Sequence, residues 1–126
     1  MIGKPAILRG PMMPQRQKTL NFSKEYKNAI LSGRKTCTIR LKTKLKAGDK
    51  ALIIAGGERL GIAKITSVRR KKLSELDMED VKHEGFRSLK ELRRALRKHY
   101  GELDSATPVS VIRFHLISRE NPKNRN

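Results

Sequence analysis

From residue 19 onward, the apolar positions of the chain follow short strand-like and helix-like periods. The run TLNF at 19–22 is typical of a short strand, and the segment 24–31 places its apolar side chains on one helical face before Gly33 ends the helix. A run rich in β-branched residues at 36–41 then predicts a second strand.

The middle of the chain predicts a β-hairpin. The lysine-dense linker 42–50 contains a Gly-Asp pair that is typical of a turn. Two apolar, β-rich runs follow at 51–55 and 59–68, and a short glycine turn at 56–58 separates them. Two such runs joined by a glycine turn are expected to pair as antiparallel strands.

A first capping pattern follows the hairpin. Ser74 and Asp77 have the three-residue spacing of a capping box, which predicts a short helix over 73–81. The polar segment 82–86, which contains glycine, is expected to be a loop.

A second capping pattern, Ser88 with Glu91, precedes leucines that recur at helical spacing until Gly101. After it, the run 109–117 predicts a strand long enough to be central. The short strands lie too close in sequence for a doubly wound sheet. The expected fold class is therefore α+β, a small mixed β-barrel with helices packed on it.

Length and charge narrow the class of protein. The 126 residues suffice for one core, and 37% of them are apolar. We expect a basic N-terminal extension at 1–18, a folded domain at 19–118 and a polar tail at 119–126; a short apolar patch at 5–8 is compatible with an edge strand. Thirty Lys and Arg against twelve Asp and Glu leave a net charge of +18, which indicates a polyanionic partner.

Membrane and metal sites are not expected. No apolar stretch approaches the roughly 20 residues that span a bilayer, and no secretory signal is visible, so we expect a cytoplasmic protein with no membrane partner. Cys37 is the only cysteine, and the three histidines lack partners at zinc-ligand spacing. We therefore expect no metal and no cofactor. The sequence does not determine the oligomeric state, and a monomer is the expectation.

The positive charge is clustered, which favours nucleic acid over a merely solvated lysine-rich surface. The basic helix predicted after Ser88 is isolated among strands and carries no Asn or Gln for contacts with base edges, which disfavours a helix-turn-helix that reads DNA. Single-stranded or structured RNA is therefore the expected partner. The few aromatic residues disfavour an extended stacking platform but leave room for a pocket for one base. The expected RNA-binding cations form three clusters: Arg34, Arg40, Lys42, Lys44 and Lys46; Arg69, Arg70, Lys71 and Lys72; and Arg93, Arg94 and Arg97.

Several segments together resemble one known family. FSKEYKNAILSGRKTCTIR, KAGDKALI, GIAKITSV, VKHEGFRSLKELRRALRKHYG and VSVIRFHLI are similar to the ASCH (activating signal cointegrator homology) family of the PUA-like superfamily, over about residues 19–117. The resemblance implies a PUA-like β-barrel with a cleft between barrel and helices. It also implies an association with RNA or with modified nucleosides.

Within that family, the chain looks most like small members that hydrolyse the acetyl amide of N4-acetylcytidine. The resemblance assigns Lys35 and Thr38, in GRKTCTIR, and Glu84, in HEGF, as catalytic residues. Thr38 would attack the acetyl carbonyl, Lys35 would activate it, with Arg34 and Arg40 as positive neighbours, and Glu84 would assist departure of the amine.

Strict alternation along a strand places Lys35 and Thr38 on opposite faces, so convergence requires Lys35 to precede the strand. Arg40 is expected in the cleft, paired with an acid or a phosphate. Cys37 is expected to be a buried packing residue.

Three functions remain open at this point. They are an RNA-binding module with a cleft for a modified pyrimidine nucleoside, an amidohydrolase acting on free N4-acetylcytidine, and a ribonuclease or regulatory RNA-interaction protein. A metal-free ribonuclease needs paired acid and base groups, for which His83 beside Glu84 is the local candidate.

Overall fold

Five strands form one curled mixed sheet, which a computed structural model describes for residues 17–120. The strand order is β1-β3-β4-β5-β2, so β1 and β2 are the two edges. The elements follow one another as β1 (Thr19–Phe22), a 3-10 helix (Lys24–Tyr26), α2 (Lys27–Leu31), β2 (Cys37–Arg40), β3 (Lys50–Ala55), β4 (Glu58–Lys72), a 3-10 helix (Leu73–Glu75), α3 (Met78–Glu84), α4 (Leu89–Tyr100) and β5 (Pro108–Arg119).

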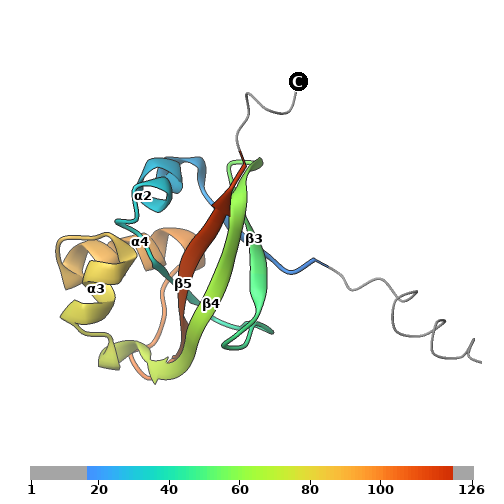
Figure 1. The fold of residues 1–126 in the computed structure, drawn as a ribbon. Helices are drawn as coiled ribbons and strands as arrows, with labels where there is room; N and C mark the ends of the chain where they lie inside the picture. The colour runs from blue at the N-terminus through green and yellow to red at the C-terminus, as the bar shows by residue number, and fades with distance from the viewer. Residues whose placement is uncertain (1–16, 121–126) are drawn as a thin grey trace, which may run out of the picture.

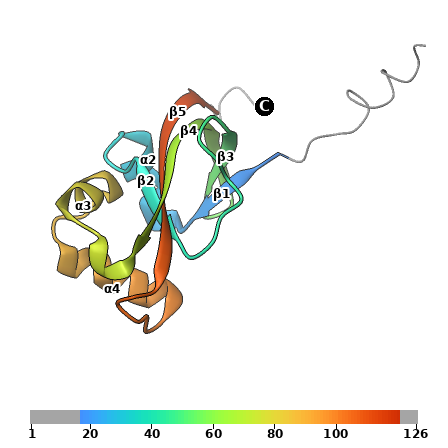
Figure 2. The ribbon, with the colours of Figure 1, turned by 90° about the horizontal axis from the view of Figure 1, so that it is seen from below.

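The expected α+β fold, in which helices pack on a small mixed sheet, is confirmed. The sheet forms a curled half-barrel whose edge strands β1 and β2 do not pair with each other. The helices lie together on one side of the long strands β4 and β5 (Figure 1, Figure 2). β1 pairs in parallel with β3, and the other three pairs are antiparallel. The register of β4 against β5 shifts twice, and such bulges increase the twist that curls a sheet.

The predicted hairpin joins β3 to β4. Its two loop residues, Gly56 and Gly57, have φ angles of 58° and 84°. Two consecutive positive φ angles suit a tight turn whose twist matches the flanking strands, and glycine adopts them without steric cost.

The buried apolar residues form two clusters. One fills the curl of the sheet and includes Ile53, Ile65 and Phe114. The other lies between β2, β5 and the helices, and includes Val81 and Leu92. Both clusters include residues of β5, with Ile112 in the first and Val109 and Val111 in the second.

Two local predictions around α3 are wrong. Ser74 lies in a 3-10 helix, and α3 begins later, with Asp77 as its N-cap and Asp80 completing the capping box. Leu76 between them is extended and buried, so packing of that side chain interrupts the expected helix. The predicted loop at 82–86 is also partly helical, because α3 continues to Glu84 before Gly85 ends it.

The strand predicted at 59–68 is longer in the structure, because β4 continues through the basic run 69–72 to Lys72. The predicted patch at 5–8 lies outside the described residues. Among residues 17–120, no helix has both the length and the apolar character needed to cross a membrane.

Gly61 provides a test of the β4–β5 pairing. A Cβ at this position would lie 1.9 Å from the backbone oxygen of Ser118. We expect Gly61→Ala to lower the free energy of unfolding by about 3 kcal/mol or more, because backbone atoms must move. Gly57→Ala, where a Cβ meets nothing within 4 Å, is the matched control and costs about 1–2 kcal/mol for its positive φ. Urea denaturation measures both; equal losses would contradict the steric explanation.

Candidate functional site

A cleft of about 270 Å³ opens between the edge strands β1 and β2 on one side and the helices on the other. Its lining residues come from both core clusters, with aromatic side chains on several sides. The lining is Asn21, Phe22, Ser23, Tyr26, Lys35, Thr38, Ile39, Arg40, Glu84, Phe86, Leu92, Ala95, Leu96, His99 and Tyr100. The structure therefore brings Lys35, Thr38 and Glu84 into one cavity.

Lys35 is buried, with 3% of its surface exposed. Its backbone N–H donates to the carbonyl of Ala29 in α2 at 2.9 Å, and β2 starts only at Cys37. The expectation that Lys35 precedes the strand is confirmed. Because it lies in the turn, its side chain reaches the same cavity as Thr38.

Aromatic rings surround the Lys35 ammonium group. Its Nζ lies 4.9 Å from the ring centre of Tyr26, 5.7 Å from that of Phe22 and 5.8 Å from that of Phe86. Ring faces attract cations most strongly where water is excluded. These rings therefore hold the amine in place and provide flat apolar walls beside it.

Glu84 is the direct partner of Lys35. The two form a buried ion pair, with Nζ donating to Oε1 at 3.1 Å and lying 3.4 Å from the Glu84 carbonyl oxygen. The side-chain partner of the Lys35 ammonium is thus a carboxylate, whereas Arg34, which was expected as a positive neighbour, is exposed.

The second oxygen of Glu84 has no partner. Oε2 is buried and makes no hydrogen bond within residues 17–120. Burial raises the pKa of the Glu84 carboxyl, and the nearby Lys35 offsets part of this effect. A buried oxygen without a partner in a cleft is an available position for a ligand N–H or for a proton.

Thr38 and Arg40 extend from β2 into the same cleft. Arg40 donates through Nε to Thr38 Oγ1 at 2.9 Å and through Nη2 to the carbonyl oxygen of Asn21 at 2.7 Å. Its guanidinium also lies over the Phe22 ring at 5.1 Å. Arg40 is in the cleft as expected. It was expected to pair with an acid or a phosphate, and within the protein its hydrogen-bond partners are a hydroxyl and a carbonyl. Burial lowers the pKa of its guanidinium.

Sequence reasoning missed the cleft roles of Tyr26, Phe86, His99 and Tyr100. Tyr26 Oη and His99 Nε2 lie 3.4 Å apart, and Tyr100 Oη donates to the carbonyl of Ile39 at 3.4 Å. Tyr26, His99 and Tyr100 occupy helix positions that also suit core packing, and Phe86 lies between α3 and α4. Their spacing alone does not distinguish a wall of the cleft from a core residue.

Two other candidates lie elsewhere. His83 does not line the cleft; its Nδ1 is 3.2 Å from Thr36 Oγ1. Cys37 is fully buried, and burial raises the pKa of its thiol, which fits the expected packing role.

The predicted RNA-binding cations differ in their surroundings. Lys42, Lys44 and Lys46 are exposed in the β2–β3 loop, as are Arg93 and Arg94 on α4. Other members bind partners within the fold. Arg70 donates to the Leu41 carbonyl and Ser110 Oγ, Arg97 pairs with Glu102, Arg69 and Lys71 pair with Asp80, and Lys72 is exposed beside them.

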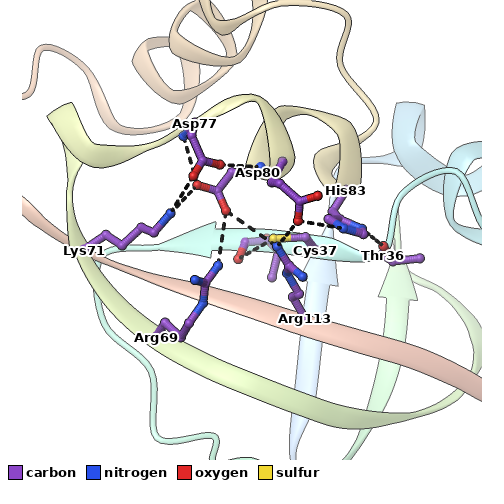
Figure 3. A network of polar contacts seen from close by, with 10 residues as sticks. Thr36, Cys37, Arg69, Lys71, Asp77, Asp80, His83 and Arg113 are labelled. Carbon is purple, nitrogen blue, oxygen red and sulfur yellow. Dashed lines mark hydrogen bonds and ion pairs between the residues drawn. The ribbon is translucent and has the colours of Figure 1, made fainter.

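Asp80 lies beside two of these cations, Arg69 and Lys71, and beside Arg113, as Figure 3 shows. It is fully buried, and its carboxylate lies 2.7 Å from Lys71 Nζ, 3.5 Å from Arg69 and 4.0 Å from Arg113. It also accepts the backbone N–H of Asp77. Asp80 therefore attaches α3 to β4 and β5, one helical turn before Glu84.

The role of Asp80 in fixing α3 can be tested by Asp80→Asn. A neutral amide leaves the partly buried cations without their counter-charge, and we expect a loss of about 2–3 kcal/mol in unfolding free energy. Glu79→Gln is the control, because Glu79 is 68% exposed and should change stability by less than about 0.5 kcal/mol. Equal effects in urea denaturation would show that burial of Asp80 is not what matters.

Comparisons with known proteins agree with this fold. The sequence model of the ASCH domain family matches residues 14–118. A protein from Enterococcus faecalis V583 superposes with a TM-score of 0.68 at 17% identity, over 93% of this chain and 91% of that one. An ASCH domain from Lactobacillus crispatus gives 0.65 at 19%, over 78% and 80%. A mutant ASCH protein from Zymomonas mobilis gives 0.60 at 18%, over 86% and 78%. The comparison with curated proteins finds no match.

Proposed function

The chain belongs to the ASCH domain family, and we propose that it binds RNA and that its cleft receives a pyrimidine nucleoside, from which it removes an N4-acetyl group. One observation carries the proposal: the buried pair Lys35–Glu84 lies in the same aromatic-walled cavity as Thr38. Burying two charges costs several kcal/mol each, so such a pair beside a cavity is typical of a working site.

The cavity suits one base. Its volume of about 270 Å³ is below the roughly 300–1,000 Å³ of pockets for drug-sized ligands, so it has room for a single planar ring system. Phe22, Tyr26 and Phe86 offer faces on which a base can stack. Glu84 Oε2 offers the polar contact that a cytosine amino or acetamido N–H requires.

The chemistry follows from the three side chains. In the proposed reaction, a proton first shifts from Lys35 to Glu84 across their 3.1 Å contact, which converts the ion pair into a neutral amine and a neutral acid. Thr38 Oγ1 then attacks the acetyl carbonyl carbon, and its proton moves to the Lys35 amine. The hydrogen bond from Arg40 stabilises negative charge at that oxygen. Glu84, which burial favours in the neutral form, donates a proton to N4 as the C–N bond breaks. Water then hydrolyses the acetyl ester of Thr38 and releases acetate.

Two alternative functions have less support. A hydrolase of free N4-acetylcytidine needs Lys35, Thr38 and Glu84, but a nucleoside has no phosphates that would require a net charge of +18. The charge therefore favours RNA as substrate or ligand. A ribonuclease built on His83 and Glu84 is disfavoured, because His83 does not line the cavity.

The triad predicts large losses of acetate release from N4-acetylcytidine, measured both as the free nucleoside and within RNA. We expect Thr38→Ala to lower kcat by about 10³-fold or more, and Lys35→Ala or Glu84→Ala by about 10²–10⁴-fold. Thr36→Ala is the matched control, because Thr36 lies outside the cavity lining and should retain activity. Undiminished release from all three variants would refute the assignment, and circular dichroism checks that each is folded.

The same assay has a pH signature. If protonated Glu84 is the acid, activity falls as the pH rises through a pKa that lies above the ordinary carboxyl value. Glu84→Gln should remove that alkaline limb along with most of the activity. An unchanged limb in the residual activity of this variant would assign the limb to another group.

RNA binding should depend steeply on salt, because the proposed contacts are made to phosphates. For single strands the slope of log Kobs against log[salt] is about −0.7 per contact. Titrations of labelled single-stranded and structured RNA between about 50 and 200 mM salt measure this slope. Affinity that barely changes over this range would contradict phosphate contact as the purpose of the charge.

A further inference from the structure

A second and larger concavity adjoins the cleft. It has a volume of about 550 Å³, roughly twice the 270 Å³ of the cleft. We call it the basic groove; its lining is Gln17, Lys18, Thr19, Leu20, Arg40, Lys42, Thr43, Lys44 and Leu45. Four of these nine residues are cationic and none is acidic, so the groove has a positive lining.

Arg40 belongs to both concavities. It lines the cleft and the basic groove, and its guanidinium bridges the open side of the half-barrel. The edges β1 and β2 are not paired with each other, and Arg40 on β2 joins them through its hydrogen bond to the Asn21 carbonyl. The groove therefore begins where the cleft ends, at the gap between the two edge strands.

The cations of the groove are available to a ligand. Lys42 and Lys44 are exposed and make no ion pair within residues 17–120. Lys18 pairs with Asp49 at 2.8 Å but remains 46% exposed. By contrast, Arg69 and Lys71 face Asp80. The exposed Arg93 and Arg94 line neither the cleft nor the groove.

We infer that the basic groove binds the phosphates of the nucleotides flanking the base in the cleft, so that the ligand of this site is a single strand of RNA. This rests on the proposed function, and it specifies a polymer in place of a free nucleoside. A base seated in a buried cleft must be unstacked and unpaired, which a single strand permits at little cost. Its backbone then leaves past Arg40, the residue that lines both the cleft and the basic groove.

The test is Lys42→Ala combined with Lys44→Ala. The probe is a labelled single-stranded RNA of about 8 nucleotides with one central cytidine, measured by fluorescence anisotropy across a salt series. Two lost phosphate contacts should reduce the salt slope by about 1.4. From about 50 to 200 mM salt, the unaltered protein should then lose about sevenfold more affinity than the double variant. Binding of free cytidine should not change.

The matched control is Lys50→Ala combined with Lys64→Ala. These exposed lysines are cross-strand partners on β3 and β4, and neither lines the groove or the cleft. This variant removes the same charge and should keep the slope of the unaltered protein. If both variants lower the salt slope of RNA binding to the same extent, the effect comes from net charge and not from the groove, and the inference is overturned.

Failure of the groove and failure of the proposed function are distinguishable. If RNA binds with a steep slope that Arg93→Ala with Arg94→Ala reduces and the groove variant does not, the groove inference is overturned while RNA binding stands. If the unaltered protein binds neither the RNA nor cytidine, the proposed function itself fails. Thermal unfolding checks that both groove substitutions, which lie at exposed positions, leave the fold intact.

Discussion

The buried ion pair between Lys35 and Glu84 is the interaction on which the site depends. The two residues are 49 positions apart in sequence, and their pairing joins the turn before β2 to the last residue of α3. A buried charge without its partner costs several kcal/mol, so each side chain requires the other to be in place. The pair therefore couples the sheet to the helices at the point where the cavity opens.

Asp80 supports this pair from the neighbouring turn of the same helix. It binds cations of β4 and β5, which fixes the depth and rotation of α3, and residues four apart on a helix point to similar sides. The contacts of Asp80 therefore help to hold Glu84, one turn later on α3, in position for its ion pair with Lys35. Two of the cations that suggest a nucleic-acid surface, Arg69 and Lys71, thus pair with Asp80 inside the protein.

Much of the fold could be predicted because its signals are local. The glycine turn, the Ser88 cap and the β-branched runs each involve a few adjacent residues, and the structure has the elements in the predicted order. The start of α3 could not be predicted in the same way. Two overlapping capping patterns compete there, and the burial of Leu76 in the second core cluster selects Asp77 over Ser74.

The sequence by itself determined the element order, the net charge of +18 and the requirement that Lys35 precede its strand. Only the tertiary structure decided which side chains share a cavity, because Tyr26, Thr38 and Glu84 come from separate segments that packing brings together. It also decided which cations remain free for a ligand. Local periodicity gives the face on which a residue lies, but its partner depends on contacts between distant segments.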